Sequence, residues 1–204
     1  MATRDPIAVG EWYHCYNRGF EKSKVFRSSR DYERFLLGLY LCNDRKPLRV
    51  RESRGWSLLE TLQNNTDRDT IVDIGAYALM LNHVHMVLRE KTEGGIALFM
   101  QKLFTSYTMY INKKYDRTGS LFAGTFKSKH VSDDQYLKQV IPYVLLNPDK
   151  LSGTPYSSLE DFLGTKRPEN KIVENLDSLY DKKPTLAELR KEAAMFESLR
   201  MYRG

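Results

Sequence analysis

The sequence predicts an α+β fold, in which a four-stranded antiparallel sheet of ferredoxin-like βαββαβ order carries its helices on one face. Short stretches rich in β-branched and aromatic residues supply the strands. Two longer segments, in which apolar residues recur every three to four positions, supply the helices. Hydrophobic residues make up 41% and charged residues 28% of the 204 residues, which is ordinary for a globular protein with one well-packed core.

The first two predicted elements are a strand and a helix. Residues 12–18 form a short aromatic-rich run that ends at a glycine, which is typical of a strand. Ser28 and Ser29 precede residues 31–40, whose apolar side chains share one helical face, so we expect an amphipathic helix with a serine cap. Residues 44–70 are polar and irregular, and we interpret them as a long connection or an insertion.

Two strands, a helix and a fourth strand follow. Residues 71–80 and 81–89 are both β-rich and join at a short turn, which predicts a pair of adjacent antiparallel strands. After two glycines, apolar residues repeat at helical spacing over residues 96–115, which predicts a long amphipathic helix. Residues 121–131 are then the predicted last strand of the sheet.

A further helix and a tail complete the chain. Ser132 and Gln135 form a predicted capping box for a helix over residues 133–147. The tail carries several turn signals and ends in a helix that we expect Thr185 and Glu188 to cap. One side of this last helix is apolar: Leu186, Leu189, Phe196 and Leu199.

Composition limits the class of protein. The formal net charge of +6 favours a polyanionic partner without naming it. No apolar run approaches the length of a membrane span, and the amino-terminal residues lack the apolar core of a signal peptide. Cys15 and Cys42 are too few and too far apart to suggest a zinc site or a disulfide framework. We therefore expect a cytoplasmic protein that does not associate with membranes.

Basic and aromatic residues alternate between Gln101 and His130, where six lysines or arginines face the single acid Asp116. Such a mixture suits a surface that follows phosphates and stacks unpaired bases. A solvated basic helix face over an aromatic core explains the same pattern, so this feature alone leaves both interpretations open. The six cations are Lys102, Lys113, Lys114, Arg117, Lys127 and Lys129.

The sharpest local motif is His83-Val84-His85. On a strand, alternation sends both imidazoles to one face while Val84 points to the other. Two neutral imidazoles on one face can take adjacent positions around a divalent metal ion. A pair of surface histidines on a strand is the alternative explanation.

A second motif lies in the helix predicted over residues 133–147. Tyr143 and Asn147 are four residues apart and therefore share a helical face, which sets a phenol beside an amide oxygen. That pair offers a nucleophile next to a metal ligand, although Tyr143 could equally lie in the core and Asn147 could simply end the helix. Pro142 removes a helical hydrogen bond directly before the tyrosine, and we expect a kink there.

Six ordered segments make the sequence resemble the HUH single-strand endonucleases, and within them the REP-associated tyrosine transposases, which are related to small insertion-sequence transposases. They cover most of residues 11–165. The segments are YHCYNRG (13–19), VFRSSRDYERFL (25–36), ALMLNHVHMVL (78–88), MQKLFTSYTMYINKKYDRTGSLFAGTFKS (100–128), DDQYLKQVIPYVLLNP (133–148) and YSSLEDFLG (156–164).

The resemblance implies a role for each motif residue. His83 and His85 fall on the histidine pair that holds Mg²⁺ or Mn²⁺ in this family, and Asn147 falls on the third ligand. Tyr143 falls on the nucleophile in the pattern Tyr-x-x-x-Asn-Pro. The implied function is that of a metal-dependent transposase or endonuclease. It would cleave and rejoin single-stranded, hairpin-flanked DNA through a 5′-phosphotyrosine intermediate.

The resemblance also suggests a domain organisation and a DNA-binding region. We expect a nuclease domain over residues 1–150 and a carboxyl-terminal extension over residues 151–204, either packed on the domain or flexibly attached. The cations between Lys102 and Lys129 are the expected DNA contacts, and either a monomer or a homodimer is compatible with the sequence. Two alternatives are a non-enzymatic single-stranded nucleic-acid-binding domain, and a replication or mobilisation initiator with the same chemistry.

Overall fold

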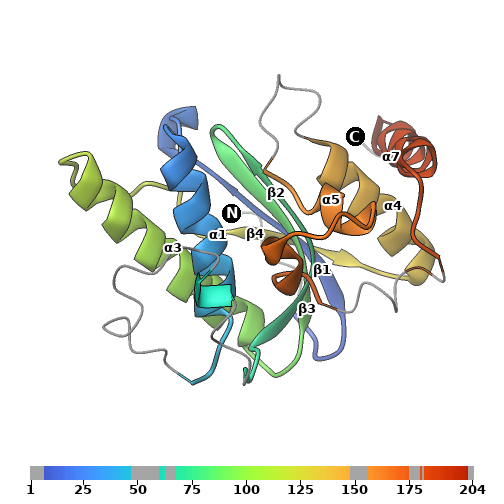
Figure 1. The fold of residues 1–204 in the computed structure, drawn as a ribbon, viewed down its shortest axis with the longest axis horizontal. Coiled ribbons are helices and arrows are strands. Elements are labelled where there is room, and N and C mark those ends of the chain that lie inside the picture. The colour runs from blue at the N-terminus through green and yellow to red at the C-terminus, as the bar shows by residue number, and fades with distance from the viewer. Residues whose placement is uncertain are drawn as a thin grey trace.

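Four antiparallel strands form the centre of the molecule (Figure 1). The structure is a computed structural model, and it describes residues 7–46, 60–62, 68–147, 156–174, 180 and 182–201. The strands lie in the order β2-β3-β1-β4. This is the order of a ferredoxin-like βαββαβ unit, so the predicted fold class is confirmed. Their bounds are β1 (Trp12–Arg18), β2 (Val72–Met80), β3 (His83–Glu90) and β4 (Lys127–Val131).

The two inner strands set the register of the sheet. β1 pairs antiparallel with both β3 and β4, so Tyr16 lies opposite His85 on one side and opposite Lys127 on the other. Paired residues share a face, and alternate residues along a strand share a face. His14, Tyr16 and Arg18 of β1 therefore stand on the same face as His83 and His85 of β3.

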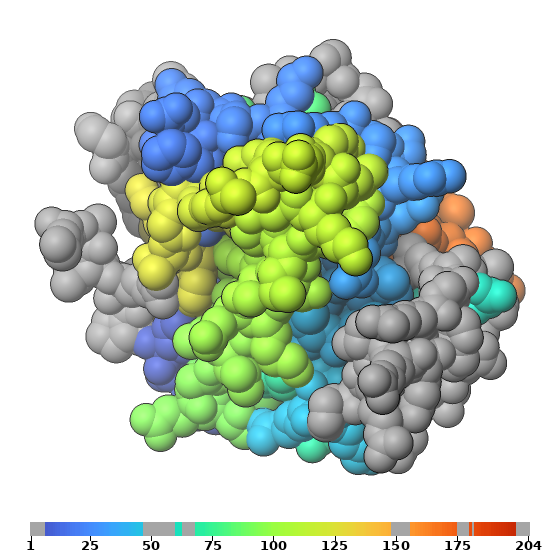
Figure 2. Space-filling view, turned by 90° about the vertical axis from the view of Figure 1, so that its left-hand side faces the viewer, coloured from blue at the N-terminus to red at the C-terminus, as the bar shows by residue number. Residues whose placement is uncertain are grey.

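Helices α1 (Ser29–Cys42) and α3 (Gly95–Lys114) cover one face of the sheet. Figure 2 shows α3 lying along the surface of this side, with α1 beside it. The two helices approach closely at Gly38, where an added Cβ would stand 2.9 Å from Leu103 Cδ1. The predicted serine cap of α1 is confirmed, because Ser28 and Asp31 form a capping box.

Asp31 joins the start of α1 to the end of α3. Its carboxylate is fully buried and accepts hydrogen bonds from Lys114 Nζ at 2.6 Å and from the Tyr115 hydroxyl at 2.8 Å. It also accepts the backbone N–H groups of Arg27 and Ser28. A buried carboxylate with this many donors fixes the two helices to one another.

Helix α4 (Asp134–Leu146) lies on the opposite face, against β2, β3 and β4. The predicted cap of this helix was wrong. Asp133 is the N-cap and accepts the Tyr136 backbone N–H at 2.7 Å, while the Ser132 hydroxyl donates to the Asp133 carboxylate. A charged acceptor satisfies the exposed N–H groups of a helix better than a hydroxyl does. The helix continues through Pro142.

The last strand is shorter than predicted, because β4 begins at Lys127 and residues 121–126 lie outside the ladder. In this stretch Phe122 forms only an isolated bridge with Gly19. Gly124 then adopts a φ of 85°, in the left-handed region that breaks an extended strand. The chain thus bends across the end of β1 before it enters the sheet.

The carboxyl-terminal part packs on the same side as α4. Residues 156–158 hydrogen-bond to β2, with Leu79 N–H donating to Tyr156 O at 2.9 Å. Helix α7 (Leu186–Met201) lies against α4, and its predicted cap is confirmed by reciprocal hydrogen bonds between Thr185 and Glu188. Two of the predicted apolar positions, Leu189 and Phe196, are buried. The side chain of Leu199 lies outside the described residues. Among the described residues between α4 and α7, two short segments are helical: α5 (Leu159–Phe162) and η3 (Pro168–Lys171).

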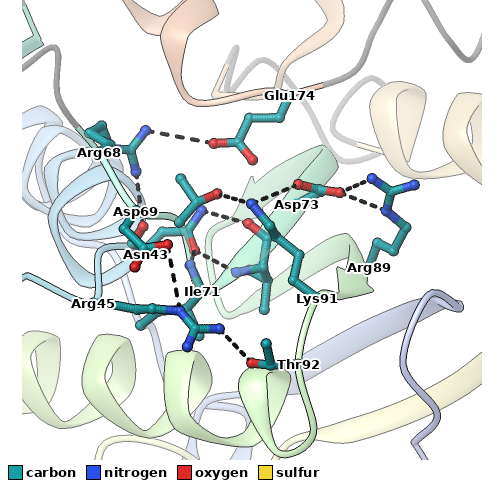
Figure 3. A network of polar contacts seen from close by, with 12 residues as sticks. Asn43, Arg45, Arg68, Asp69, Ile71, Asp73, Arg89, Lys91, Thr92 and Glu174 are labelled. Carbon is teal, nitrogen blue, oxygen red and sulfur yellow. Dashed lines mark hydrogen bonds and ion pairs between the residues drawn. The ribbon is translucent and has the colours of Figure 1, made fainter.

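A polar network ties the segment after η3 to the end of β2 (Figure 3). Glu174 donates its backbone N–H to Ile74 O at 2.9 Å, and its carboxylate lies 3.8 Å from Arg68 Nη1. Asp73 of β2 pairs with Arg89 and lies 3.7 Å from Lys91 Nζ. Two carboxylates and three cations therefore meet at this edge of the sheet.

The predicted long connection over residues 44–70 falls mostly outside the described residues. Its two ends meet, because Arg45 N–H donates to Asp69 O at 2.9 Å. Residues 60–62 are helical. None of the helices in the described part of the chain is long and apolar enough to cross a membrane.

Candidate active site

The two histidines of the His83-Val84-His85 motif stand side by side on β3. Their ring centroids lie 5.1 Å apart, and both rings project from the face that α4 crosses. Val84 points to the other face and is fully buried. The alternation of the strand thus presents two imidazoles together, as a shared ligand would require.

A single amide fixes which nitrogen His83 presents. Asn82 Nδ2 donates to the Lys22 carbonyl oxygen at 3.3 Å, and this contact orients the amide because a carbonyl can only accept. Asn82 Oδ1 therefore faces His83 Nδ1, at 2.7 Å, and must accept its proton. His83 is then protonated on Nδ1, which leaves the lone pair on Nε2. Burial lowers the pKa of His83, which favours the neutral, ligating form of the ring.

His85 is oriented by a third histidine. His14 Nε2 and His85 Nδ1 lie 2.8 Å apart, in a buried contact between β1 and β3. When Nδ1 of His85 donates to His14, the ligating nitrogen of His85 is Nε2, as it is in His83. The rings of His14 and His85 are also stacked, with centroids 5.0 Å apart.

Tyr143 faces this histidine cluster from α4. Its ring meets His14 and His85 edge-on, with centroid separations of 6.2 and 6.4 Å. Phe196 of α7 also packs against the phenol, with the two ring centroids 4.7 Å apart. Asn147 caps the end of α4 one turn beyond the tyrosine and is half-buried. The structure therefore brings the tyrosine and the histidine pair together on one face.

The residues present fit a divalent metal ion with two imidazole ligands. His83 presents Nε2, His85 presents Nε2 when its Nδ1 donates to His14, and the two rings share one face. Within the described ranges no group of three or more His, Cys, Asp or Glu side chains could hold a metal ion. The sequence predicted the side-chain oxygen of Asn147 as a third ligand, and neutral amide oxygens are among the ligands that hard divalent cations accept.

A cationic pocket with a volume of about 590 Å³ opens beside the histidines. Arg18, Lys22 and Lys127 contribute positive charge, and the described lining contains no carboxylate. The remaining lining residues come from β1, β3 and two loops: Tyr16, Asn17, Asn82, His83, His85, Ala123 and Thr125. This lining suits an anion with a flat, partly apolar body.

The rim of this pocket contains strained backbone. Glu21 and Lys22 have φ values of 50° and 58°, in the left-handed region that costs a residue other than glycine about 1–2 kcal/mol. The preceding Gly19 is required by a close approach, since an added Cβ would stand 2.1 Å from Ser23 O. Two such residues in succession hold Lys22 at the pocket and its carbonyl at Asn82.

The cations that the sequence predicted to bind DNA lie on two different sides of the sheet. Lys127 and Lys129 lie on β4, opposite Tyr16 and His14, and share the face of the histidine pair. Lys102 and Lys114 lie on α3, on the other side of the sheet, where they hydrogen-bond to Asp44 O and to Asp31. Lys113 is exposed on the same helix and Arg117 follows it. Only the β4 pair stands near the candidate site.

Sequence reasoning missed most of the residues around the histidines. His14, Tyr16 and Arg18 alternate along the first strand, so a shared face could be inferred for them. Which strand lies next to β1 is a property of the whole sheet, and the contact with His85 needs that knowledge. Lys22 and Asn82 lie in turns, where no periodic signal marks them.

The sheet order, the histidine pair on an inner strand and the tyrosine that faces it from a helix agree with the resemblance of the sequence to the HUH endonucleases. The sequence comparison narrows this class. The family model for IS200-like transposases matches residues 39–146, just over half of the chain, and the protein therefore belongs to that family. No curated protein sequence matches it.

A solved structure shares the fold. It is that of a REP-associated tyrosine transposase bound to a REP hairpin. The superposition has a TM-score of 0.54 and covers 83% of this chain and 90% of that one, at 13% sequence identity. At this identity the similarity concerns the fold alone.

Proposed function

We propose that the protein is a transposase that cuts and rejoins single-stranded DNA through a covalent bond to Tyr143. The observation that carries the proposal is the position of the phenol. It stands over His85 and His14, on the face where the histidine pair is presented. Membership of the IS200-like transposase family supports the same activity.

In the proposed reaction the Tyr143 hydroxyl attacks the phosphorus of a backbone phosphate. The bond to the 3′-oxygen breaks, the phenol releases its proton, and the leaving oxygen gains one, which gives a 5′-phosphotyrosine and a 3′-hydroxyl. One phosphoester replaces another, so the 3′-hydroxyl can later attack the phosphotyrosine and rejoin the strand. A nuclease that uses water as nucleophile cannot reverse its reaction in this way.

We propose that His83, His85 and Asn147 hold Mg²⁺ or Mn²⁺. When bound, the ion supplies positive charge to the phosphate oxygens as the tyrosine attacks. The protein orients the imidazoles in advance, His83 through Asn82 and His85 through His14. Such hydrogen bonds behind metal ligands fix the ring position and raise ligand basicity.

We propose that the substrate is single-stranded DNA flanked by a hairpin. The structural neighbour bound to a REP hairpin supports this assignment, as do Lys127 and Lys129 beside the site. Both lysines are exposed, and Lys129 Nζ also lies 5.9 Å from the centre of the Tyr136 ring. Exposed cations on one strand suit contacts to phosphates, which position DNA without reading its sequence.

The direct test is a covalent-adduct assay. The protein is incubated with Mn²⁺ and a labelled single-stranded oligonucleotide that carries a hairpin, and is then run on a denaturing gel. Wild-type protein should give a protein–DNA adduct. Tyr143→Phe should give none while binding the DNA within a few-fold of wild type, because only the nucleophilic oxygen is removed.

Tyr136→Phe is the matched control, since Tyr136 lies on the same helix and its ring also packs against Phe196. This variant should form the adduct normally. An adduct that persists in Tyr143→Phe would show that another residue is the nucleophile. If no variant forms an adduct on any hairpin DNA, the protein is a binding domain without this activity.

A further inference from the structure

The cationic pocket and Tyr143 lie on either side of His85. His85 lines the pocket and also meets the Tyr143 ring. Along β1, His14 contacts the tyrosine, whereas Tyr16 and Arg18 line the pocket. The strand rises about 3.3 Å per residue, so the pocket extends away from the phenol along the strand.

This arrangement matters because the proposed attack is in line. The nucleophile and the leaving oxygen must lie on opposite sides of the phosphorus during such a displacement. A phosphate positioned at His83 and His85, with the Tyr143 hydroxyl on one side, directs its 3′-oxygen toward the other side. The pocket begins at His83 and His85 and continues along β1 to Arg18, whereas Tyr143 contacts β1 at His14.

We propose that the pocket holds the unpaired nucleotide immediately 5′ of the scissile phosphate, and keeps it after cleavage with its new 3′-hydroxyl in place. This inference rests on the proposed function, because it identifies the leaving strand of that reaction. It adds a binding site for one nucleotide, formed by the ends of β1, β3 and β4 and by the loop over residues 123–125.

The chemistry of the lining fits a nucleotide. Arg18, Lys22 and Lys127 are exposed cations that can contact the phosphate on the 5′ side of this nucleotide. Tyr16 is half-buried and offers an aromatic ring to the sugar or base. The pocket volume of about 590 Å³ lies within the range of roughly 300–1,000 Å³ that is usual for small-molecule sites.

Retention of this nucleotide explains how the strand can be rejoined. After cleavage the 5′ end is covalently attached to Tyr143, but the 3′ end has no covalent link to the protein. A 3′-hydroxyl held close to the phosphotyrosine reacts as an intramolecular partner, which raises its effective concentration greatly. A 3′ end that diffused away would leave the protein trapped on the DNA.

The first experiment tests the pocket without any chemistry. Thymidine 5′-monophosphate is titrated into wild-type protein, Ala123→Trp and Met109→Trp, and binding is followed by amide chemical shifts. Ala123 is exposed on the pocket rim, so tryptophan there obstructs the pocket without changing its charge. Met109, 68% exposed on α3, is the matched control on the far side of the sheet.

Shifts should concentrate at residues 16–18 and 123–127, and Ala123→Trp should weaken binding by about tenfold or more through steric exclusion. Met109→Trp should bind as wild type does. Absence of millimolar binding, or equal affinity in Ala123→Trp and wild type, would overturn the proposal. This outcome does not depend on whether the protein cleaves DNA.

The second experiment assigns the strand. Once the cleavage position on a hairpin oligonucleotide is mapped, an abasic residue is placed either immediately 5′ or immediately 3′ of the scissile phosphate. With the 5′ abasic substrate, the adduct should form more slowly than with the intact substrate, and the fragment that ends in the 3′-hydroxyl should dissociate faster. In Ala123→Trp the intact and the 5′ abasic substrates should form the adduct at equal rates. A larger effect of the 3′ abasic residue would overturn the strand assignment. Failure of all DNA to form an adduct would refute the proposed function, and the nucleotide titration would still decide the pocket.

Discussion

Replacing Asn82 by alanine should weaken metal binding while the fold stays intact. The amide of Asn82 is the group that places the proton of His83 on Nδ1, through a contact of 2.7 Å, and so keeps Nε2 as the ligating atom. Loss of such a hydrogen bond behind a ligating histidine typically costs about 10- to 100-fold in metal affinity. That range corresponds to about 1.4–2.8 kcal/mol of binding free energy.

The cost in folding stability should be smaller. Asn82 is half-buried, and its second contact, to the Lys22 carbonyl, is long at 3.3 Å. We expect a loss of about 1 kcal/mol or less, the usual net value of one hydrogen bond. Asn82→Asp provides the rescue variant, because a carboxylate still accepts the His83 proton but cannot donate to Lys22. Its metal affinity should return to the wild-type value or exceed it.

The assay is Mn²⁺ binding without DNA, measured by calorimetry or by the electron paramagnetic resonance of unbound Mn²⁺. Asn112→Ala is the matched control, since Asn112 also donates from its amide to a backbone carbonyl, Gly119 O, but on the other face of the sheet. Equal Mn²⁺ affinity in Asn82→Ala and wild type, together with loss of binding in His83→Ala, would refute the tautomer argument. Nitrogen chemical shifts of the His83 ring report the tautomer directly.

Three further predictions concern stability. Phe196→Ala should lower the free energy of unfolding by about 3 kcal/mol in urea titrations, because Phe196 is 2% exposed between α4 and α7; a loss below about 1 kcal/mol would contradict this packing. Asp31→Asn should cost about 2 kcal/mol or more, since it leaves the Lys114 ammonium without its buried partner, and an unchanged urea midpoint would argue against the ion pair. Burial and the neighbouring carboxyl of Asp73 raise the pKa of Glu174 from its ordinary value of 4.5 to about 7. The folded protein therefore retains a proton that the unfolded chain loses, so stability should fall between pH 4.5 and pH 7 and then level off. The loss of stability over this pH range should be at most about 3 kcal/mol, and smaller because the Glu174 side chain is 22% exposed. Glu174→Gln should flatten the dependence of stability on pH. An equal pH dependence in that variant would assign the effect to another titratable group.

The elements that the sequence predicted correctly depend on local patterns. The first strand, α1, the β2–β3 hairpin and α3 each show their own periodicity, and their bounds in the structure agree closely with the pattern. The predicted start of β4 and the predicted cap of α4 were wrong, because at each position neighbouring residues compete for the same structural role. At Gly124 the backbone turns left-handed, and at Asp133 a carboxylate replaces the expected serine cap.

The residues of the candidate site were likewise predicted correctly only where the sequence signal is local. Strand alternation is local, so it correctly predicted one face for His83 and His85. The contact of His14 with His85 depends on strand order, which no single segment encodes. The charge run in α3 was the least informative signal, because a count of cations cannot show that Lys114 pairs with Asp31.

Helix α7 lies outside the stretch that matches the transposase family, and yet it touches the proposed nucleophile. Phe196 packs against the ring of Tyr143, 4.7 Å from it, whereas the family match ends at residue 146. Helix α7 therefore belongs to the surroundings of the phenol, although the family match does not include it. A change in α7 would alter the packing of the Tyr143 ring and leave the contacts among His14, His83 and His85 in place, since none of these contacts involves α7.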